Sequence, residues 1–229
     1  MGDDRHLHVP AAAQPPGTRP AGGAEFGCAP DLAPGMSEGM PGFSLPTSRV
    51  RLSFIAAMEE FRAEGRGTAT DDTMLGREIR DFGLDWQDLG RFEAYTSYLR
   101  DQAREDAPRR PGYVPSTTLW WVDGDEYLGR LAIRHRLTPR LTDLGGHIGY
   151  DVKPSARRQG HATAMLAAAL PLARALGIDS ALVTCDESNA GSRRVIEANG
   201  GVLEDKRGSE LRFWVPTSEP DQPVSGPGA

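Results

Sequence analysis

A short basic segment, residues 157–162, carries the clearest chemical signal in the sequence. It contains Arg157, Arg158 and Gly160 and ends at the small residue Ala162, directly before a run rich in alanine and leucine. A helix that begins at a glycine leaves its first backbone N–H groups unpaired, and the helix dipole adds partial positive charge at that end. With two arginine side chains nearby, such a turn can hold a phosphate or diphosphate group.

Two regular elements must hold this turn in place. Before it, residues 149–152 are predicted to end a strand. After it, apolar residues recur at helical spacing up to Gly177. They are Ala162, Met165, Leu166, Ala169, Leu170, Ala173 and Leu176. The order of strand, glycine turn and helix is common to phosphate-binding folds, but the spacing is neither that of a P-loop nor that of a dinucleotide-binding motif.

The composition indicates one folded domain with two tails. The chain has 229 residues, of which 38% are hydrophobic, and this is enough for one core. Residues 1–46 are rich in Pro, Gly and Ala without apolar periodicity and are predicted to be disordered, as are residues 218–229. We therefore expect the folded domain over residues 47–217. No signal peptide and no membrane-spanning stretch are predicted.

Charge and cysteine content narrow the functional classes. A net charge of −6 predicts no basic face for nucleic acid. The two cysteines, Cys28 and Cys185, indicate no disulfide framework, and a reducing, cytoplasmic location is predicted. No His/Cys cluster has the spacing of metal ligands and no Gly-x-Ser-x-Gly motif of a hydrolase occurs, so we expect no metal. No pattern predicts an oligomeric state.

The remaining pattern is that of an α/β protein. Strands are expected at residues 49–52, 117–122, 127–133, 146–152, 180–184, 202–203 and 211–215. Helices are expected around residues 54–61, 86–105, 162–176 and 192–199, with an acidic loop over residues 65–85. We predict a mixed, mostly antiparallel sheet with helices on both faces and a central strand–helix–strand unit over residues 147–184.

The pattern Arg157-x-x-Gly160-x-Ala162 resembles the acyl-coenzyme A pyrophosphate signature, Gln/Arg-x-x-Gly-x-Gly/Ala, of the GNAT superfamily of N-acetyltransferases. The order of the expected elements over residues 47–217 is also similar to that of a GNAT domain. Residues 146–163 and 183–201 look like a bacterial subgroup of predicted acetyltransferases. The resemblance implies a GNAT-like fold, acetyl-CoA as co-substrate, and transfer of the acetyl group by direct attack of an amine.

The resemblance also implies where the cofactor binds. The backbone of Tyr150, Asp151 and Val152 is expected to pair with the pantetheine arm as an added strand would. The diphosphate is expected on backbone N–H groups of the turn and of the first helical residues. These are Gln159, Gly160, His161, Ala162 and Thr163.

Four side chains complete the implied cofactor site. Arg157 and Arg158 are expected behind the diphosphate, and a solvated pair of surface arginines is the competing interpretation. Asn189 and Ser192 match the family's Asn-x-x-Ser/Ala, in which the Asn side chain meets the pantetheine arm. For Asn189 the competing interpretation is a helix N-cap, which is compatible with ligand contact.

The sequence departs from the family at the proton donor. Many members carry a Tyr seven residues after the Asn, but this chain has Ile196 there. A thiol with a pKa of about 8.5 leaves as thiolate at a cost of only about 2 kcal/mol at neutral pH, so a full proton donor is dispensable. Ser192, Ser188 or a water is expected to assist.

The general base is expected on a strand next to the thioester. His147 is the first candidate, because its pKa suits the task and two glycines precede it, and a half-buried structural histidine is the alternative. Glu187 and Asp186 are second candidates that could equally cap the following helix. His135 and His161 are not favoured as bases, and Cys185 lacks the partners of a covalent nucleophile.

The acceptor is expected to lie against the acidic segment 65–85. Its carboxylates Asp71, Asp72 and Asp81 motivate the hypothesis of a cationic amine, with ordinary surface charges as the alternative. The sequence thus predicts an acetyl-CoA-dependent N-acetyltransferase. Because Ile196 replaces the usual Tyr, a GNAT fold that binds acyl-CoA without turnover, as a sensor or interaction module, is the alternative function.

Overall fold

The computed structural model describes residues 40–218, so most of the predicted tails, residues 1–39 and 219–229, lie outside the described residues. The strands are β1 (Gly42–Ser44), β2 (Ser116–Asp123), β3 (Glu126–Arg134), β4 (Ile148–Val152), β5 (Ser180–Asp186), β6 (Val202–Arg207) and β7 (Glu210–Pro216). The helices are α1 (Arg51–Ala63), α2 (Met74–Phe82), α3 (Leu89–Asp101), α4 (Pro139–Asp143), α5 (His161–Ala175) and α6 (Ala190–Ala198). The predicted α/β class is confirmed.

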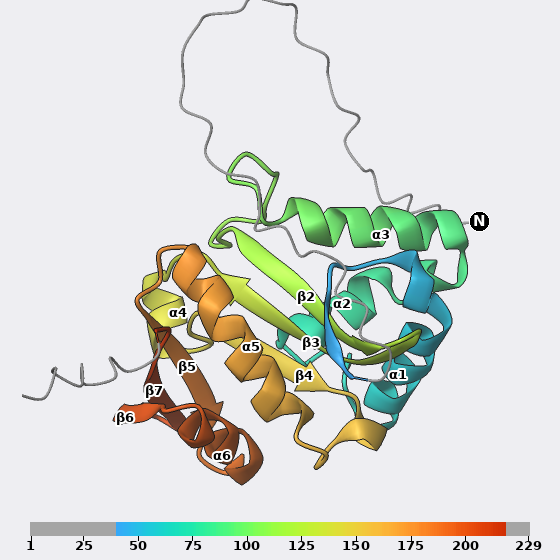
Figure 1. Cartoon of the computed structure of the whole chain (residues 1–229). Coiled ribbons are helices and arrows are strands. Elements are labelled where there is room, and N and C mark those ends of the chain that lie inside the picture. The colour runs from blue at the N-terminus through green and yellow to red at the C-terminus, as the bar shows by residue number, and fades with distance from the viewer. Residues whose placement is uncertain (1–39, 219–229) are drawn as a thin grey trace, which may run out of the picture. The chain divides into compact units, whose positions relative to one another are not determined.

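The strands pair in two antiparallel sheets. Their orders are β1-β2-β3-β4 and β5-β7-β6. The predicted hairpin of β2 and β3 is confirmed, and its turn residues are Gly124 and Asp125, one residue later than the predicted Asp123-Gly124. Within residues 40–218, β4 and β5 lie side by side but share no ladder, so the single mixed sheet expected from the sequence is divided between them. Figure 1 shows these two strands diverging toward their carboxyl ends, with α5 connecting them.

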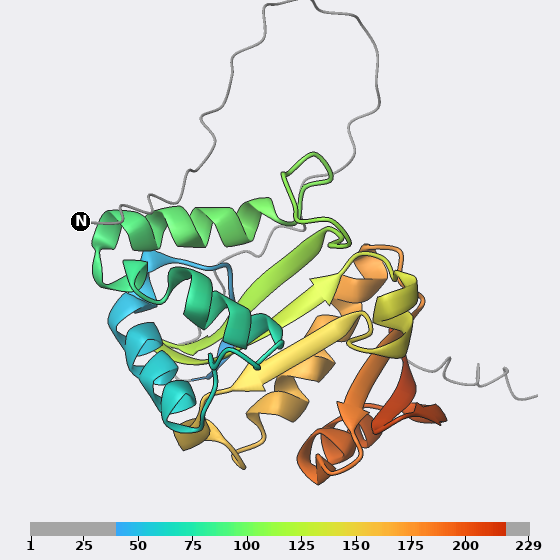
Figure 2. The same cartoon turned by 180° about the vertical axis from the view of Figure 1, so that it is seen from behind.

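Helices cover both faces of the first sheet, as predicted. Helix α5 lies across one face, and α1, α2 and α3 cover the other (Figures 1 and 2). Successive strand residues point to opposite faces. Trp121 and Leu131 therefore pack with α5, whereas Trp120 and Tyr127 pack with α1 and α3. Strands β2 and β3 are consequently buried along most of their length.

The core beneath α1, α2 and α3 is aromatic. The ring of Phe54 has centroid distances of 4.9–5.4 Å to four others, which belong to Trp86, Phe92, Trp120 and Tyr127. Each such pair contributes about 0.5–1.5 kcal/mol beyond its buried area. Helix α2 is fixed to β3 by a buried ion pair of Glu78 with Arg130, and the hydroxyl of Tyr95 donates to the same carboxylate at 2.6 Å.

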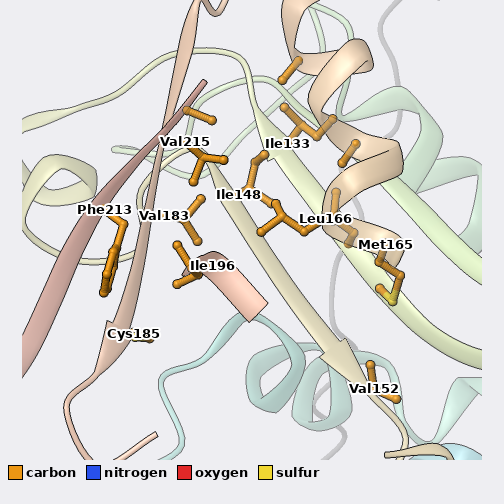
Figure 3. Close-up of a cluster of buried hydrophobic side chains, with 14 of the residues drawn as sticks. Ile133, Ile148, Val152, Met165, Leu166, Val183, Cys185, Ile196, Phe213 and Val215 are labelled. Atoms are coloured by element: carbon orange, nitrogen blue, oxygen red, sulfur yellow. The ribbon is translucent and has the colours of Figure 1, made fainter. Parts of the chain in front are cut away.

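A hydrogen-bonded joint at His147, just before β4, holds this strand to β5. The backbone N–H of His147 donates to the carbonyl of Leu182 at 2.7 Å, and the N–H of Leu182 donates to Nδ1 of His147 at 2.9 Å. Beyond the joint, side chains fill the wedge between the strands. Figure 3 shows Ile196 of α6 beside Val183 and Phe213, and all three are buried in one cluster. This packing separates the strands and leaves an opening at their carboxyl ends.

The helix predicted after the glycine turn is confirmed as α5. Its alanine, leucine and methionine residues are strong helix formers. Met165, Leu166, Ala169 and Ala173 are buried on one face of the helix, which therefore follows the apolar spacing of the sequence. Gly177 follows the helix at φ +81°, as a helix C-terminus favours.

The N-terminal part of the domain corrects three predictions. Residues 49–52 are not a strand, because Ser48–Val50 is a 3₁₀ turn capped by Thr47 and α1 starts directly after it. Strand β1 lies inside the segment predicted as a disordered tail, and its Phe43 packs edge-to-face on Trp121 at 5.0 Å. The folded domain therefore begins before residue 47.

The third correction concerns the acidic segment 65–85, which contains α2 rather than only a loop. Thr73 caps this helix by accepting from the N–H of Gly76 at 3.0 Å, and Leu75 and Ile79 form its buried face. These are ordinary helix signals, a cap followed by apolar residues four apart. The short helix α4 after β3 is also absent from the prediction.

Candidate functional site

A cleft of about 760 Å³ opens where β4 and β5 diverge. Its walls are β4, the turn before α5, the start of α6 and the segment after α1. The lining residues are Glu64, Arg66, Tyr150, Asp151, Val152, Ala156, Arg157, Arg158, Gly160, His161, Ala162, Thr163, Asn189, Gly191, Ser192, Arg194, Val195 and Ala198. Of the site residues predicted from sequence, His147, Gln159 and Glu187 do not line it. The volume suits a ligand of cofactor size.

One end of the cleft is the N-terminus of α5. Gly160 is its N-cap residue, at φ +84°, and no side chain caps the helix. A Cβ at this position would meet no heavy atom within 4 Å, so the space before the helix is open. Arg158 also has a positive φ of 62°, which is strained for a non-glycine residue. Uncapped N–H groups together with the helix dipole are the features that favour an anion at a helix start.

Arginine side chains surround this anion site. The guanidinium of Arg157 is held by both carboxylate oxygens of Glu64, at 2.7 and 2.8 Å, and its Nε donates to the carbonyl of Val152 at 3.1 Å. Arg158 and Arg194 are exposed and form no ion pair within residues 40–218. Arg157 is thus an exposed arginine held by an ion pair, and Arg158 is an exposed arginine without one among residues 40–218.

The other wall of the cleft is the free edge of β4. Antiparallel strands direct alternate residues toward their partner. The carbonyl of His147 and the N–H of Lys153 bond to β3, at 2.7 and 2.9 Å, so the odd-numbered residues between them also face β3. The backbone groups of Tyr150 and Val152 then point to the open edge. Asp151 does not share that orientation, and its side chain accepts from Arg66 at 3.3 Å.

A hydroxyl pair spans the cleft between β4 and α6. The phenol oxygen of Tyr150 lies 2.8 Å from Oγ of Ser192. Burial raises the pKa of Tyr150 to about 12, and the hydrogen bond to Ser192 offsets part of the effect. The phenol is thus a protonated donor at neutral pH. Asn189 is the N-cap of α6 and accepts from the N–H of Ser192 at 3.0 Å, while also lining the cleft.

Comparison with known proteins agrees with this geometry. No curated protein matches the chain in sequence. The family described as acetyltransferase (GNAT) domain matches residues 76–202, more than half of the chain. The chain belongs to the GNAT acetyltransferase family. The resemblance inferred from the sequence motifs is therefore confirmed.

Solved GNAT structures share the fold. Mycobacterium smegmatis RimJ in complex with CoA-disulfide matches with a TM-score of 0.54 and 18% identity, over 77% of this chain and 81% of that chain. The microcin C7 self-immunity acetyltransferase MccE, in complex with acetyl-CoA and AMP, matches with a TM-score of 0.50 and 8% identity, over 77% of this chain and 92% of that chain. At these identities the likeness shows the fold alone.

In this GNAT domain, His147 is a joint between strands rather than part of the cleft. It is buried, and its Nδ1 accepts from Leu182. Burial, followed by the charge of Arg134, lowers the pKa of His147 to about 4. A group with that pKa is a weak proton acceptor at neutral pH. The geometry thus favours the structural interpretation of His147 over the catalytic one.

The predicted acidic groups also have other partners. Glu187 is exposed and forms an ion pair with Lys206 outside the cleft. Asp71 accepts from Nε of Arg66 at 3.0 Å and from the N–H of Gly67 at 2.9 Å, so it supports the segment after α1. Asp81 pairs with Arg110 at 2.8 Å. Asp72 is exposed. Two of the three carboxylates proposed for a cationic amine are therefore already neutralised by arginines.

Several cleft residues were not predicted from the sequence. Glu64 and Arg66 come from the end of α1, far from the turn in sequence, and no local pattern marks them. Arg194 lies two residues after Ser192 and could have been noted as a further cation. Among residues 40–218, no group of three or more His, Cys, Asp or Glu side chains could hold a metal ion. No helix within the same residues has the length and apolar character needed to cross a membrane.

Proposed function

We propose that this chain is an acetyl-CoA-dependent N-acetyltransferase that transfers an acetyl group to a primary amine by direct attack on the thioester. One observation carries the proposal: a free strand edge, that of β4, leads directly to the uncapped N-terminus of α5. An extended arm with amides suits the first and a diphosphate suits the second. The CoA and acetyl-CoA bound to RimJ and MccE support the same cofactor here.

The backbone supplies most of the cofactor contacts in this proposal. Tyr150 and Val152 pair with amides of the pantetheine arm, and N–H groups from Gln159 to Thr163 hold the diphosphate. Arg158 and Arg194 add charge that no carboxylate neutralises within residues 40–218. Charge-assisted hydrogen bonds of this kind contribute about 1.5–3 kcal/mol each. Arg157 retains Glu64 and mainly orders the turn.

The transfer step needs little from the protein besides position. The amine nitrogen attacks the thioester carbonyl carbon, the C–S bond breaks, and the nitrogen loses one proton to solvent. The sulfur leaves as a thiolate and takes up a proton. Many family members have a Tyr proton donor at the position of Ile196. In this cleft the hydroxyls of Tyr150 and Ser192, 2.8 Å apart, are the available donors. Ile196 itself is fully buried.

Among residues 40–218, the one histidine that lines the cleft is His161, in the diphosphate turn. An alkylammonium with a pKa near 10 must then lose its proton to water, at a cost of about 4 kcal/mol at neutral pH. The absence of a positioned base, together with Ile196, is also what the alternative function needs, namely acyl-CoA binding without transfer. Turnover with an amine decides between the two.

The first test is calorimetric titration of acetyl-CoA, with free CoA for comparison. We expect micromolar binding to the wild-type protein and at least about a hundredfold weaker binding to Gly160→Asp, because the new carboxylate faces the diphosphate. Gly177→Asp is the matched control. Gly177 lies at the other end of α5, has φ +81° and is equally open, so it carries the same backbone strain without the site.

Each outcome has a distinct meaning. Lost binding in Gly160→Asp with normal binding in Gly177→Asp supports the turn as the cofactor site. Failure of the folded wild-type protein to bind acetyl-CoA would remove the proposed function. Binding without thiol release across a broad amine panel would favour the non-catalytic alternative.

The free thiol of Cys185 agrees with the reducing, cytoplasmic location that we propose for the reaction.

A further inference from the structure

The face of β4 opposite the cofactor cleft carries a guanidinium group. Arg134, at the end of β3, lies against Gly149, where a Cβ would be 3.6 and 3.7 Å from its two terminal nitrogens. Gly149 directly precedes Tyr150, whose side chain points into the cofactor cleft. An amine that attacks the thioester from the side of α2 would therefore pass close to Arg134.

This region has more positive than negative charge. Arg77 of α2, Arg130 and Arg134 share the side of β3 that α2 covers, and the carboxylate facing them is that of Glu78. Glu78 is already bonded to Arg130 and to Tyr95. Within the described part of the chain, Arg134 donates to the backbone carbonyls of Gly145 and Gly146, at 2.7 and 3.0 Å, and to no carboxylate.

Arg77 also lacks a carboxylate partner among the residues that the structure describes. Its guanidinium donates to the backbone carbonyl of Asp72 and lies 5.8 Å from the ring centroid of Tyr113. No ion pair within residues 40–218 includes Arg77 or Arg134. The charges of two cations on this face are thus not neutralised by a carboxylate. This costs free energy for partly buried groups unless a ligand supplies the opposite charge.

A small pocket of about 90 Å³ is lined by Arg77 and by residues of β2, the strand that pairs with the Arg134 end of β3. It lies between α2, α3 and the start of β2, and Arg77 and Ser116 are among its lining residues. Ser116 stands directly opposite Arg134 in the pairing of β2 with β3. Its Oγ is buried and has no hydrogen-bond partner among the described residues. We call this pocket, with Arg77, Ser116 and the adjacent Arg134, the arginine pocket.

We propose that the arginine pocket binds a carboxylate carried by the acceptor, so that the substrate is an amine with a nearby anionic group. Two guanidinium groups and a hydroxyl are the donors that a carboxylate prefers. The inference rests on the proposed acetyltransferase function and replaces the cationic amine suggested by the sequence. Glu78 and Asp81 also line the pocket, but Arg130 neutralises the first and Arg110 the second.

The charges of this face have two consequences. Burial, with the charges of Arg77 and Arg130, lowers the pKa of Arg134 to about 10, and a bound carboxylate would reverse the effect of those charges. Two guanidinium groups and one bound carboxylate still leave a net positive charge, which lowers the pKa of an ammonium group that binds beside them. The neutral amine is then more abundant, which helps a site whose cleft offers no positioned base.

The test uses ligands that cannot react. The CoA-loaded protein is titrated by calorimetry with N-acetylglycine, N-acetylglycinamide and N-acetyl-aspartic acid α-amide. The first offers the carboxylate of a free amino acid, the second offers none, and the third offers an acidic side chain in a peptide-like setting. We expect at least about tenfold tighter binding of one carboxylate over the neutral amide, as one charge-assisted contact gives. Whichever of N-acetylglycine and N-acetyl-aspartic acid α-amide binds more tightly identifies the source of the carboxylate, a free amino acid or an acidic side chain.

Variants assign the preference to the pocket. Arg77→Met and Arg134→Met should each remove most of the preference for a carboxylate over the neutral amide. Arg174 is an exposed arginine on α5, and Arg174→Met should leave this preference unchanged. Arg134→Lys retains the positive charge and the bonds to the Gly145 loop, so it covers the case in which Arg134→Met does not fold. Equal binding of all three ligands to the wild type, or a preference that survives in full in Arg77→Met, would overturn the proposal.

A kinetic arm separates this inference from the function on which it rests. The kcat/KM values for glycine, glycinamide and a cationic diamine are measured with acetyl-CoA. Acetylation without preference for the carboxylate would remove the arginine pocket as an acceptor site and leave the acetyltransferase function intact. Tight, arginine-dependent carboxylate binding without acetylation of any amine would support the pocket and remove the proposed function.

Discussion

The two ends of the β4–β5 pair are built from similar residues for opposite purposes. At the joined end, Gly146 has φ +56°, and a Cβ on it would lie 2.3 Å from the carbonyl oxygen of Leu182. At the open end, Gly160 has φ +84°, and a Cβ on it would meet nothing within 4 Å. Both positions need glycine for their backbone conformation. Only the first also needs it for packing.

The difference shows how a glycine can be assigned to fold or to function. A positive φ alone is shared by both ends and does not distinguish them. The atoms around each glycine do distinguish the two ends. A glycine with close neighbours lets two strands come into contact, whereas a glycine without neighbours leaves space for a ligand. Substitutions at the joint should therefore affect stability, and substitutions at the turn should affect binding.

The largest expected effect is that of Gly146→Ala. The new Cβ would collide with the backbone of Leu182 and would hold alanine at a positive φ, which together cost about 4 kcal/mol of unfolding free energy. Gly145→Ala is the control, because its φ of +103° is also strained but its nearest neighbours are side-chain atoms at 3.5 Å or more. Chemical denaturation should show a loss several times larger for the first variant. Equal losses of unfolding free energy in the two variants would mean that the backbone at Leu182 moves to accept the new Cβ without further destabilisation.

A second test uses the pH dependence of the joint. The pKa of His147 is about 4 in the folded protein, below its unfolded value, so the folded state binds fewer protons. Its contribution to stability is complete above about pH 6.5 and falls by about 3 kcal/mol as the pH drops to 4. His147→Asn keeps an acceptor for the N–H of Leu182 without a titrating group. The variant should lose correspondingly less stability over this range, as measured by urea unfolding at each pH.

The same variant tests the catalytic interpretation of His147. We expect kcat/KM above pH 7 to remain within about twofold of the wild type, since the imidazole does not line the cleft. A hundredfold loss, the size expected for removal of a general base, would return His147 to the active site.

The fold could be predicted wherever the signal is local. The β2–β3 hairpin, α5 and β5 follow from turn residues and from apolar spacing in contiguous segments. Strand β1 could not be predicted, because its three residues form no alternating apolar pattern. It is a strand only because it pairs with β2, which lies far along the chain. Helix α2 was hidden by its acidic residues, although Thr73, Leu75 and Ile79 do carry a cap and an apolar face. The division between β4 and β5 depends on tertiary packing around Ile196.

The candidate site divides in the same way. The anion turn was predictable, because its glycine, its arginines and its helix are neighbours in sequence. The ion pair of Glu64 with Arg157 and the arginine pocket combine residues from separate elements, and no spacing rule connects them. Tyr150 was expected to contribute only its backbone, because the position of Ser192 opposite its hydroxyl is a property of the folded chain.

Tyr150→Phe tests that hydroxyl at the open end of the strand pair. We expect kcat to fall about tenfold with acetyl-CoA binding unchanged, because the thiolate leaves without its nearest donor but at modest cost. The loss should shrink with a thioester of a more acidic thiol, which needs no protonation. Ser192→Ala provides the comparison. A loss confined to Ser192→Ala would assign the proton to Ser192, and an unchanged kcat in both variants would assign it to solvent.

The smallest expected change in stability comes from Gly160→Ala, and it gives the sharpest form of the comparison. Alanine at φ +84° costs about 1 kcal/mol of unfolding free energy, and Gly177→Ala, at φ +81° and equally open, should cost the same. The two variants should nevertheless differ in acetyl-CoA affinity, by about tenfold, because only the methyl group at residue 160 enters the space before α5. Thermal unfolding and calorimetry on the same samples measure both quantities. Equal affinities would mean that the ligand keeps away from Gly160, and the open glycine would then serve only the turn.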